Sequence, residues 1–439
     1  MDESEAKRQK TEVNGGLQHV HDSNGVNHFT MPNLYHHLYT VSPNELELAN
    51  AVKISPNKKT FAVCTSKGLI RVYDLKSGYL ISTLLGHTKG VSDIAYSPID
   101  SNIIALCSDD LTIRIWSISK SKCLRILKKH TFHITTMTFN SKGNLLISGA
   151  ADETIVIWDL TTGRSLKTLA AHSDPVSSVG LTPDDTIIIS GSYDGLMRLF
   201  DLGSGQCLKT LVYNSSTHGT ATASTNDVVN FPISHIQVSP NGKYILSSSL
   251  DGKIRLWDYM NNKVVKTYGG INGDIVNNKY DSGCCFITVT ENSLVASGSD
   301  HAGVLFWDIQ SKEVVFQLQP GDTVLDIAML ENGEKLITST LLGKVNVYEL
   351  NDEYEKLEGS HLEKLTLPHR ERHLGTQTPD TPMESHVEQL REASPNRTPM
   401  ATTPGTTTPR TAELTETEMP QSGELRENID TPRAALESA

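Results

Sequence analysis

Residues 190–211 read SGSYDGLMRLFDLGSGQCLKTL, and residues 148–169 read SGAADETIVIWDLTTGRSLKTL. Both stretches contain a turn around an aspartate, then an apolar run that ends in an aromatic residue and an acid, and both finish with LKTL. A stretch that recurs within one chain indicates a repeated structural unit, because each copy can build the same local structure and pack on its neighbours.

The same pattern occurs seven times. The aromatic residues that end the apolar run are Tyr73, Trp116, Trp158, Phe200, Trp257, Trp307 and Tyr348. Consecutive copies are separated by 43, 42, 42, 57, 50 and 41 residues, close to the period of about 40–45 residues that is typical of four-stranded propeller blades. Each unit contains short apolar or alternating β segments between turn residues. We therefore predict an all-β fold, a seven-bladed β-propeller of the WD-repeat type.

The ends of the repeat array predict how the ring closes. Residues 34–41, LYHHLYTV, form a β segment before the first unit, whereas the seventh unit ends at VNVYEL without a good fourth strand. We expect residues 34–41 to complete the last blade, so that the propeller covers residues 34–351. Residues 214–230, NSSTHGTATASTNDVVN, are rich in Ser and Thr, and we interpret them as a flexible insertion.

The segments outside the array, 1–33 and 352–439, are predicted to be disordered tails. Residues 351–439 contain 17 acidic and 9 basic residues, and no Phe, Trp or Tyr occurs after residue 354. Such a segment cannot bury enough apolar surface to offset the entropy of ordering it. Ser/Thr-Pro steps are either targets of proline-directed kinases or an ordinary feature of a disordered tail, and they occur at Thr378, Thr381, Ser394, Thr398, Thr403, Thr408 and Thr431.

Composition argues against several classes of protein. The formal net charge is −12, and an acidic chain without a long basic run is a poor nucleic-acid binder on its own. No apolar stretch is long enough to cross a membrane as a helix. The six cysteines form no CxxC pair, so we expect buried thiols, no metal site and no cofactor.

A histidine and an aspartate recur in each of three consecutive units, and this recurrence argues against a catalytic role. The sets are His87 with Asp110, His130 with Asp152, and His172 with Asp194. An active site occurs once, whereas a pairing that recurs in each blade is expected to satisfy buried polar groups within that blade. No phosphate-binding loop, HExxH or GxSxG motif occurs, and we predict no catalytic residues and no enzyme.

The residue before each turn aspartate is expected to lie at the mouth of the central channel, where the inner strands converge. Around the ring this position holds Ser66, Asp109, Ala151, Tyr193, Leu250, Asp300 and Leu341. A second position, at the start of the inner strand, holds Ser92, Thr135, Ser177, Ser234 and, in the sixth unit, Cys284 and Phe286. Carboxylates, hydroxyls and aromatic rings without Lys or Arg favour a cationic guest, although solvated loop tips would need no ligand at all.

Longer runs of sequence resemble one family. GHTKGVSDIAYS, AHSDPVSSV and SPNGKYILSSSLDGKIRLWDY closely resemble the WD-repeat propeller subunit of COMPASS/MLL-type histone H3 lysine-4 methyltransferases, over residues 34 to about 350. The resemblance implies a non-catalytic nuclear scaffold that bridges the SET-domain methyltransferase and a second WD-repeat subunit, with the histone H3 tail as a further candidate partner. From the composition, we expect no membrane association and no direct contact with nucleic acid.

The resemblance also implies two sites. The first is a mouth that takes an arginine side chain, and its residues match Ser66, Ser92, Asp109, Ser177, Tyr193, Cys284 and Phe286. Thr135 departs from the family, because it stands where the family has one of two phenylalanines around the arginine. The second is a groove for the other WD-repeat subunit on the opposite face, and its residues match Asn241, Tyr244, Leu256 and Gln310.

A second hypothesis is a WD-repeat substrate adaptor of a ubiquitin ligase. Such an adaptor would carry an additional helix and basic residues at the mouth for phosphorylated peptides, and the sequence contains neither. The scaffold hypothesis is therefore the leading one.

Overall fold

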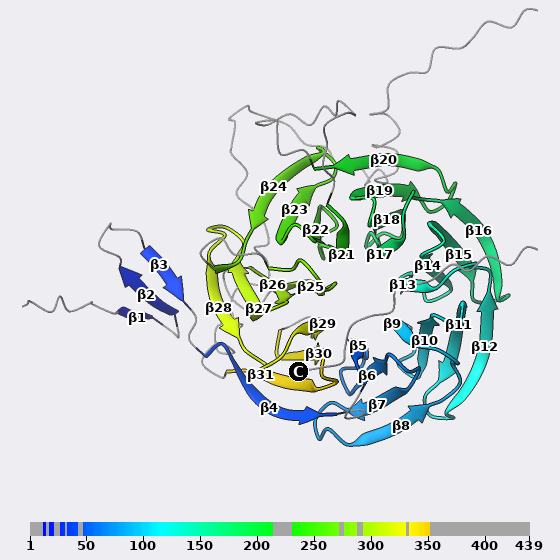
Figure 1. Cartoon of the computed structure of the whole chain (residues 1–439), viewed down its shortest axis with the longest axis horizontal. Coiled ribbons are helices and arrows are strands. Elements are labelled where there is room, and N and C mark those ends of the chain that lie inside the picture. Colours follow the sequence, from blue (N-terminus) through cyan, green and yellow to red (C-terminus); the bar gives the residue numbers. More distant parts are fainter. Residues whose placement is uncertain are drawn as a thin grey trace, which may run out of the picture. The chain divides into compact units, whose positions relative to one another are not determined.

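The computed structural model describes residues 12–14, 17–21, 27–30, 33–42, 47–213, 231–271, 276–287, 293–330 and 333–351. Seven four-stranded antiparallel sheets form consecutive blades around a central axis, as shown in Figure 1. The prediction of a seven-bladed propeller is thus confirmed. The insertion 214–230, predicted to be flexible, and the C-terminal tail 352–439, predicted to be disordered, lie outside the described residues.

The first four blades follow the chain order. The first contains β5 (Ala49–Ile54), β6 (Thr60–Thr65), β7 (Ile70–Asp74) and β8 (Leu80–Leu84). The second contains β9 (Val91–Tyr96), β10 (Ile103–Ser108), β11 (Thr112–Ser117) and β12 (Lys122–Lys128). The third contains β13 (Ile134–Phe139), β14 (Leu145–Ala150), β15 (Thr154–Asp159) and β16 (Arg164–Ala170). The fourth contains β17 (Val176–Leu181), β18 (Ile187–Ser192), β19 (Leu196–Asp201) and β20 (Cys207–Val212).

The last three blades continue the same order, except at the end. The fifth contains β21 (Ile233–Val238), β22 (Tyr244–Ser249), β23 (Lys253–Asp258) and β24 (Lys263–Tyr268). The sixth contains β25 (Cys284–Ile287), β26 (Leu294–Ser299), β27 (Gly303–Asp308) and β28 (Val314–Leu318). The seventh contains β29 (Val324–Met329), β30 (Lys335–Thr340), β31 (Val345–Leu350) and β4 (Tyr35–Val41).

Strand β4 closes the ring, as predicted from residues 34–41. It pairs antiparallel with β31, so that Tyr35 lies opposite Leu350 and Val41 opposite Val345. The fourth strand of the last blade therefore comes from the start of the array. In addition, the structure contains a three-stranded sheet of β1 (Glu12–Asn14), β2 (Leu17–His21) and β3 (Asn27–Thr30), which the sequence analysis did not predict.

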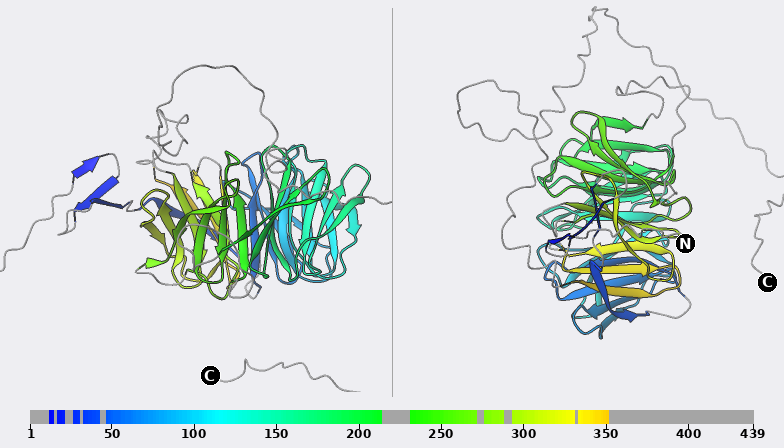
Figure 2. Two further views of the ribbon diagram at one scale, coloured as in Figure 1. Left: turned by 90° about the horizontal axis from the view of Figure 1, so that it is seen from above. Right: turned by 90° about the vertical axis from the view of Figure 1, so that its left-hand side faces the viewer.

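Successive residues of a strand point to opposite sides of the sheet. In each blade the residues on both sides are apolar, so both faces of the blade are apolar. In β18, Ile187 and Ile189 pack with the fifth blade, whereas Ile188 between them packs with the third. Seven buried clusters of this kind fill the seven blade-to-blade contacts. Figure 2 shows the ring from the side, with its strands running from one face of the ring to the other.

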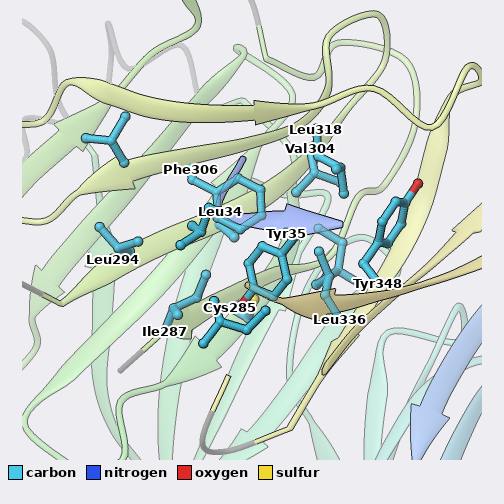
Figure 3. Close-up of a cluster of buried hydrophobic side chains, with 14 of the residues drawn as sticks. Leu34, Tyr35, Cys285, Ile287, Leu294, Val304, Phe306, Leu318, Leu336 and Tyr348 are labelled. Atoms are coloured by element: carbon cyan, nitrogen blue, oxygen red, sulfur yellow. The ribbon is translucent and has the colours of Figure 1, made fainter. Parts of the chain in front are cut away.

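The cluster at the closing contact joins the sixth and seventh blades with β4 (Figure 3). The Tyr35 ring stacks on Phe306 with 5.6 Å between ring centroids. Its hydroxyl donates a hydrogen bond of 2.7 Å to the Gly333 carbonyl. Burial raises the pKa of Tyr35 well above its usual value, so this hydroxyl remains a proton donor.

We expect Tyr35→Ala to lower the free energy of unfolding by about 3–5 kcal/mol, because it removes a buried ring and leaves the Gly333 carbonyl unpaired. Leu38→Ala, on the same strand but with an exposed side chain, should cost less than about 1 kcal/mol. Urea unfolding followed by tryptophan fluorescence measures both variants. Equally small losses would show that the Tyr35 anchor does not hold the closing strand.

Candidate functional site

The recurring His–Asp pairs are structural parts of the blades. In the third blade, His130 Nδ1 lies 3.0 Å from Asp152 Oδ2 and its Nε2 lies 2.8 Å from Ser148 Oγ. Trp158 Nε1 donates to the same serine at 2.9 Å. The side chains of His87, His130 and His172 are fully buried. A buried imidazole cannot reach a substrate, so these pairs serve the fold.

The pKa values of the paired carboxylates agree with this role. Burial acts to raise the pKa of Asp152, but hydrogen bonds from His130, Thr154 and the Thr131 N–H outweigh it, so its pKa lies well below the usual value. Asp110 and Asp194 are shifted in the same direction, again with their histidines among the causes. Each carboxylate therefore stays ionised and paired within its blade.

A cavity of about 380 Å³ lies where the inner strands converge. Six of the residues predicted to lie at the mouth line it, namely Ser92, Thr135, Ser177, Tyr193, Ser234 and Leu341. Asp109 adjoins them, because its Oδ1 accepts a hydrogen bond of 3.3 Å from Ser92 Oγ. A β-carbon at Gly90 would lie 2.6 Å from the Ser66 carbonyl oxygen and 3.0 Å from Asp109 Oδ2, so there is no room for a side chain there. The structure thus brings together five of the seven residues that the resemblance implied for the arginine site, along with Thr135.

Cys284 and Phe286 do not lie at the mouth, so this part of the prediction is wrong. Cys284 lies opposite Ser297 on β26. In the fifth blade, the residue opposite the equivalent Ser247 is Ile236, which belongs to the core. Cys284 therefore occupies a core position. Cys284 is buried, and Phe286 packs on the same apolar cluster between the fifth and sixth blades. The inner strand of the sixth blade is therefore shifted by two residues from the predicted alignment.

The mouth position predicted for Cys284 is occupied by Ser282. Its hydroxyl donates a hydrogen bond to the first residue of the next inner strand, as do the hydroxyls at two equivalent positions. The pairs are Thr135 with the Val176 carbonyl, Ser177 with the Ile233 carbonyl at 2.5 Å, and Ser282 with the Val324 carbonyl at 2.8 Å. These hydroxyls connect neighbouring blades, so neither Thr135 nor Phe286 provides an aromatic wall for a guest.

Other residues at the mouth have roles that the sequence did not indicate. The Tyr193 hydroxyl donates a hydrogen bond to Asp281, and both side chains line the cavity. Burial raises the pKa of Asp281. Asp300, predicted to be free at the mouth, is buried and accepts hydrogen bonds from the N–H groups of Asn278 and Lys279 at 2.8 and 2.9 Å. Asp300 therefore orders its loop in place of the turn aspartate that the sixth blade lacks.

Charged side chains deeper in the channel were missed by the sequence analysis. Lys53 Nζ lies 2.8 Å from Asp326 Oδ2, which joins the first blade to the last. Asp93 and His235 line the same cavity. Burial raises the pKa of Asp93 and, together with the nearby Lys53, lowers that of His235 to about 4. Asp93, His235 and Asp326 lie one residue after the hydroxyl position of their inner strands, and Lys53 lies three residues after it. Extending the same alignment along the strands would have found them.

The predicted groove residues lie at the opposite ends of the strands. Tyr244 begins β22 opposite Asp258, whereas Ser249 at the mouth end closes the same strand. Asn241 and Gln310 are exposed, and Tyr244 is half-buried on the cluster that also holds Phe286. Leu256 is only 2% exposed, so it belongs to the core beneath this surface. Three of the four predicted residues are thus accessible on this face.

The described residues contain no group of three or more His, Cys, Asp or Glu side chains that could hold a metal ion. In the same part of the chain, no helix is both long and apolar enough to cross a membrane. Its six cysteines are free thiols.

Comparison with known proteins adds the family context. A family model described as the WDR5 β-propeller domain matches residues 45–349. COMPASS component SWD3 of Saccharomyces cerevisiae is 36% identical over 273 residues, which are 61% of this chain and 83% of that protein.

Other relatives match over shorter stretches. Polycomb protein EED of Chaetomium thermophilum is 33% identical over 126 residues, and this match spans 24% of the chain but only 22% of that protein. Pre-mRNA-processing factor 19 of Bos taurus is 32% identical over 79 residues, or 18% of the chain and 16% of that protein.

The lowered pKa of His235 predicts a dependence of stability on pH. The unfolded state binds a proton below a pKa of about 6.5, but the folded state does so only below about 4. The contribution of His235 to the free energy of unfolding is therefore fully present above about pH 6.5 and decreases as the pH falls toward 4. At pH 5 it has decreased by about 2 kcal/mol. His235→Asn should make this loss smaller in urea unfolding at pH 7 and 5. Equal losses in the variant and the wild type would contradict the assignment, and His301→Asn, at an exposed position, serves as the control.

Proposed function

The chain belongs to the WDR5 β-propeller family, and on this premise we propose that it is a scaffold subunit of a COMPASS-type histone H3 lysine-4 methyltransferase complex. The observation that carries the proposal is the match to the COMPASS component SWD3, which extends over 83% of that protein. A match of this extent includes the loops of both faces as well as the strands. A nuclear location follows from the proposed role.

We propose that the chain has no catalytic activity of its own. Its recurrent His–Asp pairs are buried within the blades, and the channel residues Lys53, Asp93 and Asp326 are engaged in contacts between blades. The purified chain is therefore expected to transfer no methyl group, while the complex needs it for full activity.

The two faces of the ring suit two different partners. At the mouth, Asp93, Asp281 and Asp326 outnumber Lys53 among the cavity residues, so the cavity favours a positively charged side chain, as an arginine or lysine of a SET-domain subunit would supply. On the opposite face, Asn241 and Gln310 are exposed and the ring of Tyr244 is half-buried. An aromatic ring with polar neighbours is a common centre for a protein interface, and we assign this groove to a second WD-repeat subunit.

Purification of the tagged chain from cells, followed by mass spectrometry of the bound proteins, tests the proposal. We expect a SET-domain methyltransferase and a second WD-repeat protein in stoichiometric amounts. Recovery of a ubiquitin ligase without these two proteins would instead support the role of a substrate adaptor.

Single substitutions should separate the two faces. Asp281→Ala should weaken binding of the SET-domain partner about tenfold or more, because a charge-assisted contact contributes about 1.5–3 kcal/mol, and should leave the second WD-repeat subunit bound. Tyr244→Ala should have the reverse effect. Asp100→Ala and Tyr79→Ala change exposed side chains of the same types away from both sites and serve as controls. Loss of both partners in either variant, with an unchanged thermal transition, would contradict the division into two faces.

A further inference from the structure

Another cavity opens on the face opposite the mouth. It has a volume of about 360 Å³ and lies where the inner strands of the first three blades, β5, β9 and β13, end. Eight of the twelve residues that line it are apolar. Among these, Ile54, Ala95 and Phe139 are half-buried, so a guest can reach their side chains. We call this space the far cavity.

The far cavity is separate from the two sites described above. Lys53 lines both the far cavity and the cavity at the mouth, and its ammonium group contacts Asp326 at 2.8 Å. This ion pair therefore lies between the two cavities. The groove residues Asn241 and Gln310 belong to the fifth and sixth blades, whereas the far cavity is formed by the first three. Neither the mouth nor the groove accounts for it.

Contacts between neighbouring turns hold the rim of the far cavity in place. The Asn57 N–H donates a hydrogen bond of 3.1 Å to Ser101 Oγ and so joins the turns of the first and second blades. A β-carbon at Gly143 would lie 3.0 Å from Ile99 Cγ1, so the turns of the second and third blades are also in contact. A rim that is already ordered lowers the entropy cost of binding a ligand.

The rim is basic, although the whole chain has a net charge of −12. It consists of the turns that follow the three inner strands, namely residues 55–59, 97–102 and 140–144. These turns contain Lys58, Lys59 and Lys142 but only one acidic residue, Asp100. All three lysines are exposed, and none of them forms an ion pair with another described residue. The corresponding turn of the fourth blade, residues 182–186, has two aspartates and no basic residue.

An apolar cavity with a basic rim matches a peptide that carries both kinds of group. A large apolar side chain can enter the cavity, and acidic residues beside it in sequence can pair with the lysines. Phosphate groups of a nucleic acid would use the lysines but would leave Ile54 and Phe139 without a partner. We propose that the far cavity binds a segment of a partner protein in which a large apolar residue is flanked by acidic residues. The proposal does not depend on the function proposed for the mouth and the groove.

Photo-cross-linking from the rim identifies the segment that binds. Ile99 is 72% exposed and follows Pro98, which lines the far cavity. The full-length protein with p-benzoylphenylalanine in place of Ile99 is cross-linked in cells, and the attached segment is sequenced by mass spectrometry. We expect an apolar residue with acidic residues on both sides and no basic residue between them. The same photoreactive residue in place of Ile81, which is 53% exposed on β8, serves as the control and should give at least fivefold less of this product.

Calorimetric titration with a synthetic peptide of the cross-linked segment then tests the chemistry of the contact. Lys58→Glu/Lys142→Glu should weaken binding at least tenfold, because two attractive charges become repulsive. Lys128→Glu/Lys129→Glu reverses two exposed lysines on the mouth side of the second blade and should change the affinity less than twofold. Replacing the central apolar residue of the peptide by serine should also weaken binding at least tenfold, and this change leaves the propeller unaltered.

Four results would overturn the proposal. Cross-linking from position 99 that does not exceed that from position 81 would show that no partner binds the far cavity. A basic or uncharged segment, or a peptide whose affinity is the same for Lys58→Glu/Lys142→Glu and the wild type, would contradict the proposed chemistry. Cross-links to this same chain, within one molecule or between two, would replace the partner protein. Binding of a 20-base-pair DNA duplex that is lost in Lys58→Glu/Lys142→Glu, without a cross-linked segment, would assign the rim to nucleic acid.

Discussion

Each blade has two apolar faces, and only a closed ring covers both faces of every blade. Ile187, Ile188 and Ile189 show the problem on a single strand, since alternate residues require a neighbour on each side. An open array would leave one face of its first blade and one face of its last blade in water. Pairing of β4 with β31 prevents this, because it fixes the last blade to the start of the array. Closing a loop of about three hundred residues costs only a few kcal/mol more than closing a short one, since the cost grows with the logarithm of length.

Apolar packing between the blades stabilises the closed ring, whereas the hydrogen bonds within the blades vary. The third blade has the full set of Asp152, His130, Ser148 and Trp158. In the second blade, leucine stands at position 106 where the third blade has Ser148, and Trp116 Nε1 has no hydrogen-bond partner among the described residues.

The fifth blade uses different residues for the same purpose. Arg255 pairs with Asp251 and lies over the Tyr213 ring at 3.8 Å. The fifth blade keeps the bond from Trp257 to Ser247 that corresponds to the bond from Trp158 to Ser148. The blades thus share their apolar pattern but only some of their hydrogen bonds, and this difference explains why the repeats can diverge without loss of the fold.

The repeat pattern made most of the fold predictable, including the closing strand and the order of the blades. Prediction of the site failed where the spacing changed. The sixth repeat is longer than most, and aligning its inner strand on the apolar residues Cys284 and Phe286 displaced the mouth position by two residues from Ser282. The correct alignment could have been found from the end of β26. Residues Ser297–Ser299 there correspond to Ser247–Ser249 of β22.

Other features of the site could not be predicted from the repeats. The pair of Lys53 and Asp326 joins residues 273 positions apart, and the contact of Tyr193 with Asp281 joins the fourth blade to the segment before the sixth. A periodic pattern specifies how one blade resembles another. It does not specify which side chains from different blades meet in the centre.

The charges of the channel serve both the scaffold and the site. Asp326 accepts a hydrogen bond from the Val52 N–H of the first blade, and Asp93 accepts one from the Met137 N–H of the third. The same carboxylates make the cavity favourable for a cation and unfavourable for a phosphate. Changing either residue therefore alters the contact between blades as well as the electrostatic potential. Asp281 differs, because its hydrogen bond comes from the side chain of Tyr193, so its charge can be removed without breaking a backbone contact between blades.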